Sequence, residues 1–246
     1  ANFKKLIVRR GRGEPVAYIL GTKGFHAIDL AVGPGVLVPR PETEYLVDHV
    51  LQRFADHRPR GPVLDLCTGS GAIALALAHA WIEPDGIDDA PAIIASDLST
   101  DALEYARQNA AALGLSEAVT FVRGDGLTAV ANHGPFAAIV SNPPYVLTGI
   151  IQTLQPDVRD FEPALALDGG ADGMNLLRHI ARNAAQNLLP CGSLAVELGS
   201  PAQGAQFVEL LAQNGLAGAA FVAIGPGPTG YVTATMPHIT RIAAAV

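Results

Sequence analysis

Residues 62–78 read PVLDLCTGSGAIALALA, and this stretch decides the fold. Its apolar start predicts a short buried strand, and the Ala/Leu run at its end predicts a helix packed on that strand. The small residues between them, 67–71, let the backbone come close to a ligand and let the helix lie close to the sheet. The spacing D-x-x-x-G-x-G is neither the dinucleotide fingerprint nor a phosphate-binding P-loop. The stretch therefore predicts an α/β fold with a ligand-binding loop, and a plain strand-to-helix turn is the alternative.

Three further strands are expected, and each ends beside a polar residue or motif. The carboxyl ends of parallel strands meet at one edge of a sheet, where ligands bind in open α/β folds. Asp97 is placed there to accept hydrogen bonds from a ribose diol, and a planar base could lie beside Asp125. Asp65, inside the first strand, suits a cationic or hydroxyl-rich ligand better than a phosphate. The three strands are expected over residues 92–97, 119–122 and 136–141.

The last of these strands runs into Asn142-Pro143-Pro144-Tyr145. Two consecutive prolines cannot continue a strand, so the chain leaves the sheet on a stiff loop. The Asn142 carboxamide can accept from an amine N–H and can also donate, and the Tyr145 ring can cover a planar group. A functional motif for a flat nitrogen substrate and a proline-rich turn that only caps backbone groups are both consistent with this stretch.

The flanking segments predict smaller features around this core. Two short strands over 14–21 and 24–32 predict a hairpin that turns near Gly21–Gly24, and a helix begins near Pro41 or Thr43. Arg40 before that helix either anchors an acidic group or is a surface charge, and its spacing favours the surface. The long loop at 146–171 is typical of a lid or binding loop. Later elements are expected as a helix to about 189, a strand at 193–198, a helix at 201–214 and a closing hairpin of 219–224 with 231–236.

Composition narrows the class of protein. The chain has 246 residues, of which 49% are hydrophobic and 16% charged, which is typical of one compact α/β enzyme domain with a substantial core. The net charge of −7 and the lack of a long basic run argue against nucleic-acid binding. Two cysteines without a C-x-x-C pair indicate a reducing compartment. We expect no membrane helix, no metal site and a cytoplasmic location.

Several separated motifs together resemble a known family. The D-x-x-x-G-x-G loop, Asp97, Asp125 and the Asn-Pro-Pro-Tyr motif resemble class I methyltransferases that use S-adenosylmethionine. Residues 14–21, 36–44 and 157–163 narrow the resemblance to the glutamine N5-methyltransferases that modify bacterial peptide chain release factors. The resemblance covers roughly residues 8 to 200, and Cys67 stands where that family usually has glycine.

The resemblance implies a fold and a division of the chain. The expected fold class is α/β, with a doubly wound, mostly parallel seven-stranded sheet of the class I methyltransferase type and a small N-terminal β-hairpin appendage. Residues 1–13 are interpreted as a possible remnant of an N-terminal helical domain, 14–40 as the hairpin and linker, and 41–246 as the S-adenosylmethionine-binding methyltransferase domain.

The resemblance also implies a role for each site residue. Asn142 and the Pro143 carbonyl would accept from the two hydrogens of the attacked amide, and Tyr145 would pack on the amide plane, so these three are the expected catalytic residues. The residues expected to bind substrate are Arg40, Glu42, Asn142, Pro143, Pro144 and Tyr145. Those expected to bind the cofactor are Asp65, Cys67, Thr68, Gly69, Ser70, Gly71, Asp97, Leu98, Asp125, Gly126 and Asn142.

The implied activity is methylation of a glutamine side-chain nitrogen in a protein, most directly the Gly-Gly-Gln loop of a peptide chain release factor, by a monomeric enzyme. Three alternatives stay open. The same motif suits the N6 amine of adenine, although the acidic net charge counts against a nucleic-acid substrate. A diverged relative could methylate a small metabolite. A protein that only binds the cofactor is the third.

Overall fold

The computed structural model describes residues 2–85, 90–224 and 227–237. A seven-stranded sheet runs through its centre, in the order β5-β4-β3-β6-β7-β9-β8. The five strands from β5 to β7 are parallel, whereas β9 is antiparallel to both of its neighbours. The strands are β3 (Val63–Leu66), β4 (Ile93–Asp97), β5 (Val119–Arg123), β6 (Phe136–Ser141), β7 (Leu188–Leu198), β8 (Ala217–Ala223) and β9 (Gly230–Thr235). The α/β fold with a mostly parallel sheet is therefore confirmed.

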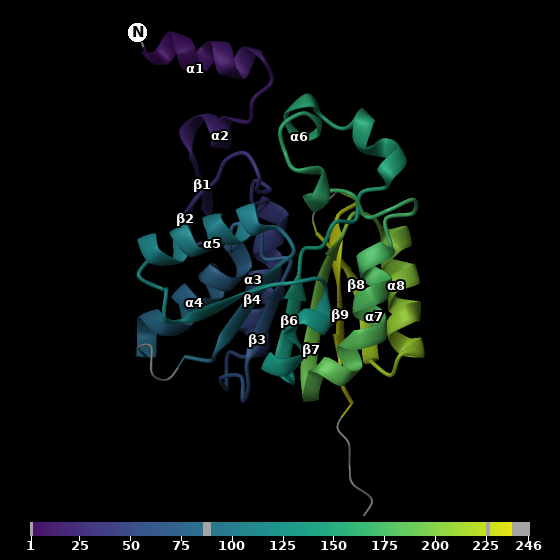
Figure 1. Ribbon diagram of the computed structural model, residues 1–246. Coiled ribbons are helices and arrows are strands. Elements are labelled where there is room, and N and C mark those ends of the chain that lie inside the picture. Colours follow the sequence, from purple (N-terminus) through teal and green to yellow (C-terminus); the bar gives the residue numbers. More distant parts are fainter. Residues whose placement is uncertain (1, 86–89, 225–226, 238–246) are drawn as a thin grey trace, which may run out of the picture.

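Helices cover both faces of the sheet, so the parallel strands are buried on each side (Figure 1). One core contains residues of α3, α4 and α5, and the other contains residues of α7 and α8. The largely apolar sequences of β3 and β6 follow from this double cover, because every side chain of these strands is buried. The helices are α3 (Glu44–Arg53), α4 (Ala72–Asp85), α5 (Thr100–Ala112), α7 (Asn175–Asn187) and α8 (Pro201–Gln213).

The strand order indicates at which edge of the sheet a ligand would bind. The chain passes from β3 to β4 on one side and later returns to β6 on the other side of β3. Open α/β sheets bind ligands at such a reversal, beyond the carboxyl ends of the strands. The segment between β6 and α7 lies over this edge (Figure 1). It contains the short helices η4 (Thr148–Thr153), α6 (Pro156–Arg159) and η5 (Ala164–Ala166).

A separate two-stranded antiparallel hairpin precedes the main sheet, as expected, but its predicted strands were misplaced. It pairs β1 (Thr22–Phe25) with β2 (Ile28–Ala31), so the chain turns after Phe25 and not near Gly21–Gly24. The segment predicted as the first strand contains the helix α2 (Val16–Leu20). Pro15 precedes this helix, and Gly21 ends it in the left-handed conformation (φ 78°). The helix α1 (Asn2–Gly11) comes before it.

Asn109 of α5 fastens the hairpin to the main domain. Its Oδ1 accepts from the Ala31 backbone N–H at 2.7 Å, and its Nδ2 donates to the Ala31 and Ser70 carbonyls at 3.1 and 2.9 Å. One buried side chain thus connects the hairpin and the loop after β3. None of the helices in the described part of the chain is long and apolar enough to cross a membrane.

Candidate active site

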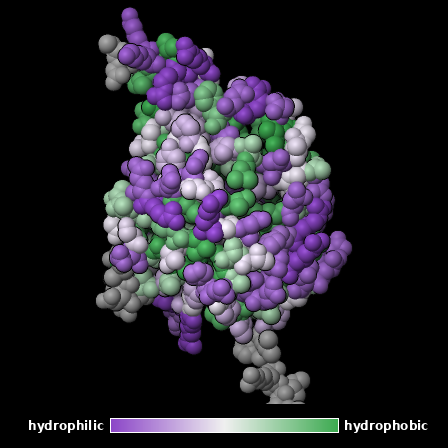
Figure 2. Space-filling model, in the orientation of Figure 1, coloured by the Kyte–Doolittle hydropathy of each residue, from purple (hydrophilic) through white to green (hydrophobic). Residues whose placement is uncertain are grey.

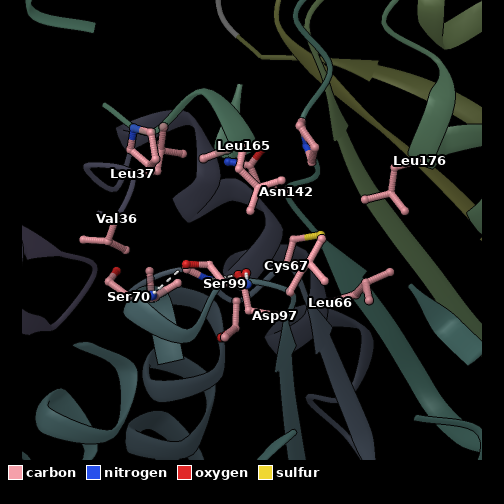
Figure 3. Close-up of a pocket in the computed structure, with 18 of the residues that line it drawn as sticks. Val36, Leu37, Leu66, Cys67, Ser70, Asp97, Ser99, Asn142, Leu165 and Leu176 are labelled. Carbon is pink, nitrogen blue, oxygen red and sulfur yellow. Dashed lines mark hydrogen bonds between the residues drawn. The ribbon is translucent and has the colours of Figure 1, made fainter. Parts of the chain in front are cut away.

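A cavity of about 470 Å³ opens at the carboxyl ends of β3, β4, β5 and β6. Its size falls within the range of roughly 300–1,000 Å³ that is common for ligand sites. Apolar side chains show in the middle of the face below α2 and α6, among hydrophilic ones (Figure 2). Figure 3 shows Ser70, Asp97 and Ser99 on one side of the cavity, and Asn142 and Leu165 on the other.

Asp65 holds the loop after β3 in shape from behind. Its side chain is fully buried, and its Oδ2 accepts from the Thr68 hydroxyl at 2.6 Å and the Ala74 N–H at 3.0 Å. Its Oδ1 has no hydrogen-bond partner among the described residues. Burial raises the pKa of Asp65 to about 7, against the two hydrogen bonds, which lower it. Asp65 does not line the cavity, so it would affect ligand binding only by fixing the conformation of the loop.

The loop itself needs unusual backbone angles. Cys67, Gly69 and Gly71 all have positive φ, of 63°, 57° and 85°. Glycine adopts this region readily, whereas Cys67 does so at a cost in backbone energy. A Cβ on Gly71 would lie 2.8 Å from the Leu75 side chain, so any other residue would require that side chain to shift in addition to adopting the positive φ. Of the predicted loop residues, Cys67, Thr68, Gly69 and Ser70 line the cavity, whereas Gly71 packs behind them.

Asp97, at the end of β4, joins the loop to the next strand. Its Oδ2 accepts from the Gly69 N–H at 2.9 Å, and its Oδ1 accepts from the Ser99 N–H at 2.8 Å. Burial raises the pKa of Asp97, while these N–H groups lower it. Each oxygen keeps acceptor capacity for a ligand hydroxyl, because a carboxylate oxygen can accept more than one hydrogen bond. Asp97 and Leu98, which were predicted to bind the cofactor, line the cavity, and Ser99 is an additional lining residue.

Asp125 and Gly126 lie at the far end of the cavity with a residue that the sequence did not reveal. A Cβ on Gly126 would be 2.4 Å from His179 Nε2, so the His179 ring occupies the space of a side chain at 126. His179 Nε2 accepts from the Leu127 N–H at 3.0 Å, which places the proton of a neutral ring on Nδ1. His179 therefore presents a flat, neutral ring to the cavity, and only its neighbour Gly126 could have hinted at it.

Asn142 and Pro144 line the opposite side of the cavity, whereas Pro143 is buried beneath them. Asn142 Nδ2 donates to the Thr43 hydroxyl oxygen at 2.9 Å. Tyr145 lies behind the lining, where its hydroxyl donates to Glu197 Oε1 at 3.0 Å. Burial, followed by the nearby Glu197 charge, raises the pKa of Tyr145, so this group stays a neutral phenol. Thr43 also lines the cavity and was not predicted as a site residue.

The two other residues predicted to bind substrate lie outside the described lining. Arg40 donates to Glu162 Oε2 at 2.6 Å, and the Glu162 side chain is only 2% exposed. Burial raises the pKa of Glu162, and the Arg40 charge opposes that rise. This ion pair connects the start of the 3-10 turn η1 (Pro41–Thr43) to the segment that covers the cavity. Glu42 is exposed at the surface.

The charged side chains that line the cavity are acidic. Four carboxylate side chains line the cavity, and the lining contains no lysine or arginine among the residues that the structure describes; the four are Asp97, Asp101, Asp125 and Asp168. Such a cavity favours a cationic ligand over a phosphate. No group of three or more His, Cys, Asp or Glu residues in the described ranges is arranged to hold a metal ion.

The sheet order and the ligand edge are those of the class I methyltransferase fold. Residues 41–154 match the family model "Methyltransferase small domain". A methyltransferase structure from Pyrococcus furiosus aligns with a TM-score of 0.61 and 20% identity over 97% of this chain and 99% of that one. A T. thermophilus 16S rRNA N2 G1207 methyltransferase, solved with AdoMet and guanosine, has a TM-score of 0.62 and 17% identity over 87% of this chain and 49% of that one. These structural likenesses show the fold alone.

Sequence relatives identify the family. The release factor glutamine methyltransferase of Neisseria gonorrhoeae is 44% identical over 215 residues, which are 87% of this chain and 74% of that protein. The protein of the same name from Caulobacter vibrioides is 43% identical over 81% of this chain and 66% of its own length. The chain belongs to the release factor glutamine methyltransferase family. It spans about two thirds of the length of several of these relatives.

Proposed function

We propose that the protein transfers a methyl group from S-adenosylmethionine to the side-chain nitrogen of a glutamine in a peptide chain release factor, in the cytoplasm. The observation that carries the proposal is the make-up of one cavity. The glycine loop and Asp97 lie on one side, and the Asn142 carboxamide lies on the other. A methyl donor and an amide acceptor can therefore meet inside it. The named activity of the sequence relatives supports the same reaction.

The residues present fit the proposed cofactor. Both Asp97 oxygens keep acceptor capacity for ribose hydroxyls after their bonds to Gly69 and Ser99. The four carboxylates of the lining suit a positively charged sulfonium compound. Residues 67–70, Asp97 and Leu98 would hold the methionine and ribose portions, with Asp125 and Gly126 beside the adenine. When bound, the cofactor supplies an electrophilic methyl group.

The chain then has to position the acceptor nitrogen. The Asn142 oxygen accepts one amide hydrogen and the Pro143 carbonyl accepts the other, which aligns the nitrogen lone pair with the methyl group. The cofactor held by residues 67–70, Asp97 and Leu98 would supply its methyl group to this nitrogen, and the electron pair of the former methyl–sulfur bond would stay with the cofactor. The nitrogen then loses one proton to water. The hydrogen-bonded, neutral Tyr145 lies behind the lining and is not needed as a base.

Asn142→Ala in the presence of labelled cofactor tests this proposal. We expect the intact protein to label a release factor at the glutamine of its Gly-Gly-Gln loop, located by mass spectrometry. Asn142→Ala should abolish this labelling while cofactor affinity, measured by calorimetry, stays within about threefold. Lost cofactor affinity with unchanged turnover per bound cofactor would contradict the role of Asn142. Labelling of RNA, DNA or a small metabolite in place of the release factor would favour the alternative substrates.

A further inference from the structure

A hydrogen-bonded row joins three side chains from distant parts of the chain: Asn142, Thr43 and Glu197. Thr43 is in the middle, in the turn η1, and is buried. Its hydroxyl donates to Glu197 Oε2 at 2.7 Å and accepts from Asn142 Nδ2 at 2.9 Å. Glu197 lies in β7 and is 0% exposed. Burying a carboxylate costs free energy, so the presence of Glu197 at this place calls for an explanation.

The available hydrogens determine which group donates and which accepts in each hydrogen bond of this row. The two Glu197 oxygens each face a hydroxyl, one from Thr43 and one from Tyr145. An ionised carboxylate can only accept, so both hydroxyl protons point at Glu197. The Thr43 oxygen then has only lone pairs left for Asn142. It can bind the NH2 end of that carboxamide but not the oxygen end.

This order sets which end of Asn142 is available to a ligand. Asn142 lines the cavity, and none of the described residues donates to its Oδ1. Oδ1 is also not among the buried polar atoms that lack a partner, so it is open to the cavity. The prolines stiffen the backbone but leave the rotation of the carboxamide plane undetermined.

We propose that Thr43 and Glu197 are positioning residues that hold the Asn142 carboxamide with its oxygen toward the acceptor, so that the site selects a glutamine amide and rejects a glutamate carboxylate. This inference rests on the proposed function and names the groups behind its specificity. A glutamine NH2 gives Oδ1 the donor it needs. A glutamate carboxylate would set acceptor against acceptor, and sites built around a donor strongly reject an analogue that lacks it.

Burial raises the pKa of Glu197, and the hydrogen bonds from Thr43 and Tyr145 oppose that rise by favouring the ionised carboxylate; the charge that they stabilise gives the row a second effect. Hydrogen bonds in series polarise one another, so the carboxylate draws the row toward itself and increases the negative charge on Asn142 Oδ1. Positive charge develops on the acceptor nitrogen as the methyl group arrives. A preorganised negative end beside that nitrogen stabilises the transition state. Thr43 thus sets orientation, and Glu197 adds charge.

Thr43→Val removes the hydroxyl at nearly constant volume, and Thr43→Ser is its matched control because it keeps the hydroxyl. For Thr43→Val we expect kcat to fall about 30-fold, on the scale of removing one preorganised hydrogen bond. The preference for a release factor with Gln over its Gln→Glu variant is measured as the ratio of their dissociation constants, and this ratio should fall about tenfold. Thr43→Ser should restore most of both. Cofactor affinity and thermal unfolding report on any general damage.

Glu197→Gln separates charge from orientation. The Gln oxygen can still accept from Thr43 while its NH2 faces Tyr145, so the preference for Gln should persist as kcat falls about tenfold. The positioning role is overturned if Thr43→Val leaves both kcat and the preference within twofold of wild type. It is also overturned if Thr43→Ser loses as much as Thr43→Val, since the methyl group and not the hydroxyl would then matter.

A measurement without substrate keeps this inference distinct from the proposed function. Side-chain NH2 protons of Asn142 that bond to Thr43 should exchange with solvent slowly, and about tenfold faster in Thr43→Val, as followed by NMR of the cofactor-bound protein. If the wild type labels no release factor but this difference appears, the proposed function fails and the orientation stands. Equal exchange in both proteins overturns the orientation, whatever the substrate.

Discussion

Removing the Arg40 guanidinium should destabilise the protein by leaving the Glu162 carboxylate buried without its partner. The two groups are 2.6 Å apart, and their side chains are 31% and 2% exposed. Breaking a buried ion pair from one side costs about 3–5 kcal/mol, and the partial exposure of Arg40 places this pair at the lower end, about 3 kcal/mol. For a chain of this size that corresponds to a fall in melting temperature of about 8 °C.

A double-mutant cycle measures the interaction. Arg40→Met strands the buried carboxylate, whereas Glu162→Gln strands a partly exposed guanidinium and should cost only about 1 kcal/mol. The double variant buries no unpaired charge, so we expect a coupling free energy of about 2 kcal/mol between the two sites in urea unfolding at pH 8. Pro163, Leu165 and Ala166 line the cavity next to Glu162, so cofactor affinity should fall with stability in Arg40→Met.

The pH dependence gives an independent check of the same cause. Burial raises the folded-state pKa of Glu162 above its usual value, and losing Arg40 raises it further. A raised carboxyl pKa means that folding stability is lost as pH rises and the group ionises. The deficit of Arg40→Met should therefore shrink on acidification from pH 8 toward pH 5. A deficit below about 0.5 kcal/mol at pH 8, or strictly additive single effects, would refute the reasoning. Unchanged stability with lost release-factor binding would instead support Arg40 as a substrate ligand.

Three further changes probe the cofactor side of the cavity. Cys67 has a φ of 63°, so Cys67→Gly should change the unfolding free energy by less than about 1 kcal/mol, whereas the β-branched Cys67→Val should lose 2 kcal/mol or more in urea titrations. Burial raises the pKa of Asp65 to about 7, so the contribution of this group to folding stability is greatest at acid pH and declines toward pH 7. The decline is at most about 1.4 kcal/mol per pH unit. Asp65→Asn should remove it in thermal melts from pH 5 to 8. Asp97→Ala should weaken cofactor binding about 100-fold by calorimetry, the equivalent of two lost charge-assisted hydrogen bonds, and an affinity within fivefold of wild type would contradict its assignment to the ribose.

The parts of the fold that follow from local pattern were predictable from the sequence. Largely apolar runs identified the buried strands β3 and β6, because parallel strands that are covered on both faces need apolar residues on both faces. The segment at 14–21 shows the limit of this reasoning. Its short apolar run fits a strand or a helical turn equally well, and the proline before it and Gly21 after it decided for α2.

Site residues were predictable where they end a strand and hidden where tertiary contacts bring them in. Asp97 and Asn142 follow strands directly, so parallel topology alone places them at the cavity. His179 reaches the cavity from the side of α7 and bonds a backbone N–H 52 positions away. Its contribution depends on the packing of that helix, which no spacing within the sequence expresses.

Asn142 shows why a short motif specifies a site only in part. The prolines after it direct the chain, but rotation about the last side-chain bond interchanges an oxygen and an NH2 of nearly equal size. Thr43, 99 positions away, breaks that equivalence, and it can do so only because its hydroxyl donates its hydrogen bond to Glu197. Replacing the buried Glu197 by an apolar residue would remove a desolvation cost and would also free the carboxamide to turn. The protein thus keeps a costly buried carboxylate where the choice between an amide and an acid substrate is made.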